Sequence, residues 1–98
     1  MIVKVHHNPQ GIVVAVCDSE LLGKKFETER LQLDLTASFY DGAEMTEEEA
    51  REVFRKAHIL NIVGKKSIEF CKKEGYVEEG HVIVIAGVPH AQVTIVRN

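Results

Sequence analysis

The stretch "IVKVHHNPQGIVVAVC", residues 2–17, decides the class of fold that this sequence can adopt. Two runs rich in valine and isoleucine flank "NPQG", whose proline and glycine favour a tight turn. In the first run Val3 and Val5 alternate with polar residues, which indicates a strand with one solvated face. The second run, residues 12–17, is apolar throughout and predicts a central strand covered on both sides. The stretch therefore predicts a β-hairpin at the start of an antiparallel sheet.

Three further segments predict strands. Residues 31–35, "LQLDL", place leucines on one face and polar side chains on the other. Residues 81–86, "HVIVIA", are mostly apolar, and residues 91–97, "AQVTIVR", form the last strand. Between these two, residues 87–90, "GVPH", predict a hairpin loop, because glycine tolerates positive φ and the residue before a proline is extended.

Two helices are predicted in the second half of the chain. The first begins at Thr46, which forms a capping box with Glu49. It should continue to Gly64, because one apolar stripe follows helical spacing: Ala50, Val53, Phe54, Ala57 and Leu60. Residues 65–74 predict a second helix, which Gly75 ends.

These elements together predict an α+β fold in a single domain, residues 1–98. We expect a two-layer sandwich in which two helices pack on one face of a mostly antiparallel sheet of about five strands. A chain of this length can bury one sizeable core without disulfide bonds or metals. The last strand is a candidate edge of the sheet, so an edge-strand homodimer is one way in which the chain could associate.

Composition narrows the classes of partner. The formal net charge is −3 and the pI about 5.9, which is not the basic profile of a domain that binds nucleic acid by its charge alone. No apolar run approaches the ~18 residues of a membrane span, so no membrane partner is predicted. The N-terminus lacks the apolar stretch of a signal peptide, which predicts an intracellular protein. Cys17 and Cys71 lack the spacing of a zinc site, so no metal is predicted.

The segment "VGKKS", residues 63–67, is similar to the end of a phosphate-binding loop. Such a loop also needs an upstream glycine and a strand that feeds it, whereas residues 59–63 contain no glycine and show a helical pattern. A weaker hypothesis remains, in which the start of the second helix, with Lys65, Lys66 and Ser67, holds one phosphate through free N–H groups. No spacing of histidine, serine, cysteine or aspartate predicts a catalytic residue, and no cofactor is predicted.

Lysines form a stripe on the second predicted helix. Lys65, Lys72 and Lys73 share one helical face with Glu69, and Lys66 adds to the only local surplus of positive charge. Such a stripe is either a solvated helix face or a contact for the backbone of RNA. No recognisable RNA-binding motif accompanies it.

His90 stands beside the predicted "GVPH" loop and has two interpretations. It is either a structural hydrogen-bond partner or a side chain held out for a ligand, and the sequence leaves both open.

Four segments, "VAVCDSELLGKKF", "FYDG", "NIVGKKS" and "GVPHAQ", resemble in order and spacing the archaeal family named domain of unknown function 424. The resemblance covers nearly the whole chain. It implies a cytoplasmic archaeal protein with a compact α+β fold, no established activity and an association with RNA or the translation machinery. The positions that match a functional surface of the family would be Cys17, Asp18, Asn61, Gly64, Gly87, Pro89, His90 and Gln92.

Two functions follow from these patterns. The first is a non-catalytic binding module that contacts RNA or a ribonucleoprotein. The alternative is a small ligand-binding protein or enzyme with a site near Asn61, Gly64 and His90, where polar residues gather at the ends of predicted elements. The candidate binding residues of both hypotheses are Asp18, Asn61, Gly64, Lys65, Lys66, Lys72, Lys73, Gly87, Pro89, His90 and Gln92.

Overall fold

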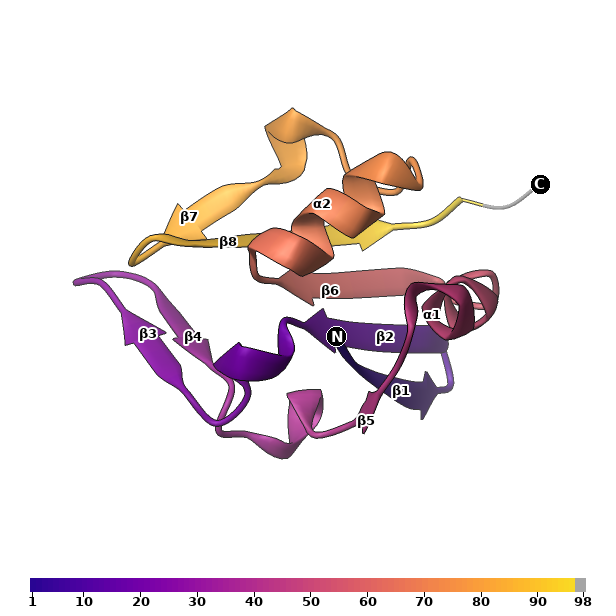
Figure 1. Ribbon diagram of the computed structural model, residues 1–98, viewed down its shortest axis with the longest axis horizontal. Helices are drawn as coiled ribbons and strands as arrows, with labels where there is room; N and C mark the ends of the chain where they lie inside the picture. The colour runs from indigo at the N-terminus through magenta and orange to yellow at the C-terminus, as the bar shows by residue number, and fades with distance from the viewer. Residues whose placement is uncertain (97–98) are drawn as a thin grey trace.

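A six-stranded sheet in the order β5-β1-β2-β6-β8-β7 organises the chain in a computed structural model that describes residues 1–96 (Figure 1). Strands β3 and β4 form a separate two-stranded sheet. Along the chain the elements are β1 (Ile2–Asn8), β2 (Gly11–Cys17), the 3₁₀ turn η1 (Ser19–Leu21), β3 (Lys25–Glu27), β4 (Gln32–Asp34), η2 (Ser38–Tyr40), β5 (Ala43–Glu44), α1 (Glu47–Phe54), β6 (Ile59–Val63), α2 (Lys65–Lys73), η3 (Glu79–His81), β7 (Ile83–Ile85) and β8 (Val88–Thr94).

The N-terminal hairpin is confirmed. β1 pairs antiparallel with β2 from Ile2 opposite Cys17 to Asn8 opposite Gly11. β2 also pairs with β6, which is the one parallel pair of the six-stranded sheet as described. The last four residues of β2 are buried, because Val14 and Val16 pack in one core and Ala15 and Cys17 in another core on the opposite face.

The helix predicted between residue 46 and Gly64 is correct only in its first half. The capping box is present, since Thr46 Oγ1 accepts the Glu49 amide hydrogen at 3.2 Å, but α1 ends at Phe54. Residues 59–63 form β6, between β2 and β8. Helical spacing failed here because nearly every side chain in this run is apolar. Such a run suits a strand covered on both faces as well as it suits a helix.

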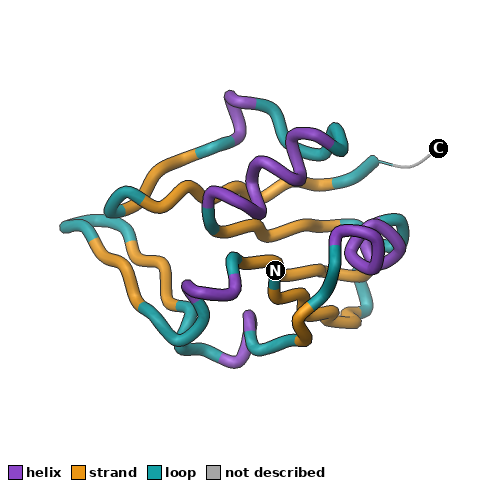
Figure 2. Tube along the Cα trace, in the orientation of Figure 1, coloured by secondary structure: helices purple, strands orange, loops and turns teal. Residues whose placement is uncertain are grey.

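The two faces of the sheet carry different covers. Alternate residues of the central strands, such as Val14 and Ile62, pack with both helices in one core. The opposite residues, such as Cys17 and Val63, form a second core with side chains from residues 19–44. The α+β class and the placement of both helices on one face are therefore confirmed. The β3–β4 hairpin and its neighbours add a partial third layer beside one end of the sheet (Figure 2).

Two expectations about the C-terminal strands need correction. The hairpin turn consists of Ala86 and Gly87 with φ of 51° and 82°, so Pro89 and His90 belong to β8 rather than to a four-residue loop. The short turn follows from these two positive φ values, which suit a two-residue hairpin connection. The last strand is not at the edge, because β7 folds back along it. The edges of the sheet are β7 and the two-residue β5. An edge-strand homodimer would therefore form through β7 rather than through the last strand.

The strand predicted at residues 31–35 is present only as β4, where it pairs with β3 instead of joining the main sheet. The three leucines expected on one buried face are divided: Leu33 and Leu35 are buried, whereas Leu31 is exposed. Neither helix within residues 1–96 is long and apolar enough to cross a membrane.

Candidate functional site

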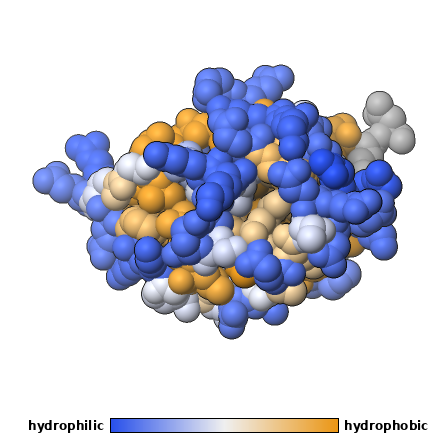
Figure 3. All heavy atoms as spheres, in the orientation of Figure 1, coloured by the Kyte–Doolittle hydropathy of each residue, from blue (hydrophilic) through white to orange (hydrophobic). Residues whose placement is uncertain are grey.

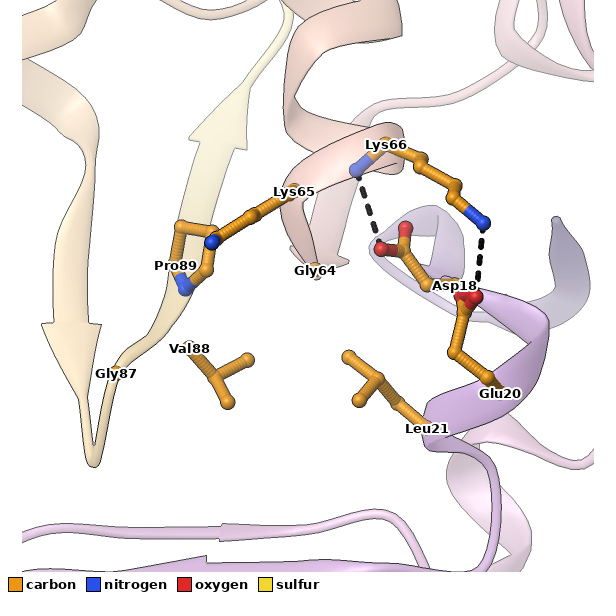
Figure 4. A pocket seen from close by; sticks show the side chains of 9 residues that line it. All are labelled: Asp18, Glu20, Leu21, Gly64, Lys65, Lys66, Gly87, Val88 and Pro89. Carbon is orange, nitrogen blue, oxygen red and sulfur yellow. Dashed lines mark hydrogen bonds and ion pairs between the residues drawn. The ribbon is translucent and has the colours of Figure 1, made fainter.

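A pocket of about 260 Å³ lies where the parallel strands β2 and β6 end (Figure 4). β6 stops at Val63 and the chain turns into α2, whereas β8 begins two residues before it meets β6 at His90. The space beyond the end of β6 is therefore flanked by η1 on one side and by the β7–β8 turn on the other. The residues that line it are Asp18, Glu20, Leu21, Gly64, Lys65, Lys66, Gly87, Val88 and Pro89.

Asp18 organises one wall of the pocket. Its carboxylate accepts hydrogen bonds from the Lys66 amide at 3.1 Å, and from the amide and the hydroxyl of Ser67, each at 2.7 Å. The side chain therefore caps α2 from 48 positions earlier in the chain, because the residue at the N-cap, Gly64, has no side chain of its own. Asp18 is only 5% exposed, so its charge is held by these donors rather than by water.

Gly64 cannot be replaced without a conflict. Its φ is +109°, a conformation that other residues rarely adopt. A Cβ atom at this position would also overlap the carboxylate of Asp18. The Gly64 amide donates to the Pro89 carbonyl at 2.9 Å, which ties the start of α2 to β8. These contacts explain glycine and aspartate at the two positions by the geometry of the pocket wall.

The inner surface of the pocket is apolar. The side chains of Leu21 and Val88 point toward each other from η1 and β8, and the Pro89 ring lies beside Lys65 (Figure 4). The hydropathy view shows an apolar area on this side of the molecule, at the level of the two hairpins, with hydrophilic residues around it (Figure 3).

The charged side chains at the mouth differ in their pairing. Lys66 Nζ lies 2.8 Å from Glu20 Oε2, and this contact lowers the pKa of Glu20 and raises the pKa of Lys66. Asp18 is engaged with α2. Lys65 has no ion-pair partner among residues 1–96, so its ammonium is the unpaired charge at this site.

A phosphate at the start of α2 would compete with the Asp18 carboxylate for the same amide groups. A strand does feed Gly64 and a helix does follow it, contrary to the helical pattern expected for residues 59–63. However, the amides of Lys66 and Ser67 already donate to Asp18. A protein carboxylate thus holds the position that a phosphate would take at a free helix N-terminus.

Two lysines of the stripe, Lys72 and Lys73, lie outside the pocket and are ion-paired, whereas Lys65 and Lys66 line it. Lys72 Nζ is 2.6 Å from Glu79 Oε1, and Lys73 Nζ is 3.0 Å from Glu47 Oε1. The Glu79 carboxylate also raises the pKa of Lys72. Lys72 and Lys73 therefore each face a carboxylate, which reduces the positive potential that a phosphate backbone would meet there.

Asn61, His90 and Gln92 lie together on another surface, the face of the sheet opposite the helices. Asn61 is directly opposite Gln92 in the β6–β8 pair. His90 lies opposite Val63, and its Nδ1 donates to the Ile62 carbonyl at 3.0 Å. The histidine thus has a structural hydrogen bond. None of these three residues lines the pocket, although the Gly64 amide donates to the carbonyl of Pro89, next to His90.

Three lining residues escaped sequence reasoning: Glu20, Leu21 and Val88. Glu20 and Leu21 lie in "DSELL", a segment that indicates a short helical turn but does not show which way its side chains point. For Val88 the sequence indicates only an extended residue before a proline. Only the pairing of β8 with β6 reveals that it extends past the end of the neighbouring strand.

The thiols take no part in the pocket. Cys17 and Cys71 are buried and unpaired, and burial raises their pKa values to about 11 and about 12. In residues 1–96, no three side chains of the metal-binding types gather into a possible metal site.

Comparison with known proteins supports the fold. The model of a family described as "Protein of unknown function (DUF424)" matches residues 5–96. A crystal structure of an uncharacterized conserved protein from Methanopyrus kandleri matches with a TM-score of 0.82 and 24% sequence identity, over 99% of this chain and 92% of that one. No curated protein matches the sequence.

Proposed function

Since the chain belongs to the DUF424 family, whose description assigns no activity, we propose from its geometry that it is a non-catalytic binding protein with its ligand in the pocket at the end of β6. One observation carries the proposal. Three of the four segments that carry the family resemblance meet there: "CDSELLGK" supplies η1, "NIVGKKS" supplies Gly64 and two lysines, and "GVPHAQ" supplies the far wall.

The chemistry of the lining favours binding over catalysis. Of its four ionisable side chains, Asp18 accepts three hydrogen bonds, and Glu20 and Lys66 pair with each other. A general base is a group positioned to take a proton from the substrate, whereas here Asp18 is committed to the start of α2 and Glu20 to an ion pair. An apolar pocket with few polar groups at its mouth is typical of a small-molecule site. A cytoplasmic location is part of this proposal.

The test uses a substitution that fills the pocket. Leu21→Trp places a larger apolar side chain in the cavity, and Leu31→Trp makes the same change at an exposed position of the β3–β4 hairpin. Wild-type protein and Leu31→Trp should retain the same small molecules from an extract of the source cells, as measured by mass spectrometry. Leu21→Trp should lose them. Equal retention by both variants would reject the pocket as the site.

RNA binding is a second candidate, and one observation favours it on the sheet face opposite the helices. The residues of β1, β2, β6 and β8 that point to this side include no aspartate or glutamate, although the chain is acidic overall. Lys4 and His6 lie on this face, with Phe39 stacked on His6 at 4.6 Å. The amides of Asn61 and Gln92 could hydrogen-bond base edges, as RNA-binding surfaces do in unpaired strands.

Isosteric charge changes test this candidate. Gln92→Glu adds one carboxylate to the sheet face, and Gln32→Glu adds one to the exposed β3–β4 hairpin. If RNA binds the sheet face, retention of single-stranded RNA at low salt should fall for the first variant and not for the second. Lys72→Glu with Lys73→Glu should then have less effect, because these lysines lie on α2, which packs on the other face of the sheet. Wild-type protein that retains no RNA would end the candidate.

A further inference from the structure

The unpaired ammonium of Lys65 specifies the charge of the ligand. Around the pocket, Asp18 is held by the start of α2, and Glu20 and Lys66 form an ion pair at 2.8 Å. These three groups have their charges satisfied within the protein. Lys65 has no such partner among residues 1–96, and its side chain extends beside the Pro89 ring at the mouth of the pocket (Figure 4).

The rest of the lining specifies an apolar body. Leu21 and Val88 face each other across the cavity, and neither offers a hydrogen-bonding side chain. A ligand that fills this space loses water from its own surface, so an alkyl or aromatic part gains from the transfer. A purely ionic ligand such as inorganic phosphate would leave the apolar wall uncovered.

Resting on the proposed function, we infer that the pocket takes a small monoanion with an apolar body, such as a medium-chain carboxylate. The apolar part lies between Leu21 and Val88, and the anionic group lies at the mouth against Lys65. The cavity of about 260 Å³ accommodates a short chain rather than a large cofactor.

Four probes test the charge and the apolar body separately: hexanoate, hexanol, hexylamine and inorganic phosphate. Each is titrated into ¹⁵N-labelled protein while the backbone amides of Leu21, Lys65 and Val88 are followed. Hexanoate should move these amides at the lowest concentration, hexanol should need more, and hexylamine and phosphate should not saturate the site. Added salt should weaken hexanoate and leave hexanol unchanged.

Matched variants locate the charge. Lys65→Gln should weaken hexanoate by about threefold, the effect of one exposed ion pair, and leave hexanol unchanged. Lys56→Gln, at an exposed lysine of the α1–β6 connection, should change neither. Hexylamine binding as tightly as hexanoate, or equal effects of the two lysine variants, would overturn the inference about the anion. Neither result would contradict the proposal that the pocket is the binding site. If neither hexanoate nor hexanol moves the pocket amides, the inference fails, and the proposed function is decided separately by the retention of extract molecules by Leu21→Trp.

Discussion

The carboxylate of Asp18 lies 2.7 Å from the backbone nitrogen of Ser67, so a side chain that follows β2 caps a helix that follows β6. The contact joins the two parallel strands at the ends where the pocket opens. It also explains why α2 can begin with a glycine, since the missing cap is supplied from another part of the chain.

Loss of this cap should destabilise the protein. We expect Asp18→Ala to lower the free energy of unfolding by about 2–3 kcal/mol, because two amides and the buried Ser67 hydroxyl lose a charged acceptor. Asp18→Asn keeps one acceptor oxygen, so its free energy of unfolding should lie between those of the wild type and Asp18→Ala. Urea denaturation measures both, and an Asp18→Ala protein as stable as wild type would show that solvent replaces the carboxylate.

Gly64→Ala should cost more than an ordinary glycine replacement. The new Cβ would meet the Asp18 carboxylate at a residue whose φ is +109°, so we expect a loss of about 2 kcal/mol or more. Gly80→Ala is the control, because a Cβ there meets no atom within 4 Å and its φ is not positive. It should change stability by about 0.5 kcal/mol or less. In a double-mutant cycle with Asp18→Ala, part of the cost should disappear, whereas strict additivity would contradict the overlap.

Elements that depend on neighbouring residues were predictable from the sequence, whereas contacts between distant segments were not. The first hairpin and the Thr46 capping box depend on neighbouring residues, and both are confirmed. β6 was missed because an apolar run does not reveal its period, and only its pairing with β2 and β8 makes it a strand. The pocket was partly anticipated residue by residue, yet its assembly was not, because Asp18 meets α2 across 48 positions of sequence.

The buried thiols predict a loss of stability in alkaline solution. Burial raises the pKa of Cys17 from 9.0 to about 11, so the native thiol stays protonated where the unfolded one ionises. The contribution of the buried thiol to the free energy of unfolding is complete below pH 9 and is lost as pH rises through about 11. Between these values the free energy of unfolding should fall by about 1.4 kcal/mol per pH unit for this thiol.

Cys17→Ala isolates this effect from the titration of other groups. The variant should show a shallower fall of stability between pH 9 and 11 than wild type in chemical denaturation. The burial that raises the pKa of Cys71 persists in both proteins and cancels in the comparison. Identical pH slopes would mean that Cys17 is not protected from ionisation in the native state.

The β7 edge predicts self-association. Ile83 and Val84 are 49% and 63% exposed, and residues 82–86 carry no charge, so a second copy could pair antiparallel without opposing like charges. We expect concentration-dependent dimers in sedimentation velocity, and Val84→Lys should shift them to monomers. Lys56→Gln should not. A wild-type protein that sediments as a monomer at the highest soluble concentration would contradict the prediction.

The most direct test of the binding site is the set of backbone amide shifts on adding a small-molecule extract of the source cells to labelled protein. The pocket account predicts that the shifts cluster at Leu21, Lys65 and Val88, which three separate segments bring together. Shifts confined to Asn61 and Gln92 on the sheet face, or no shifts at all, would contradict it.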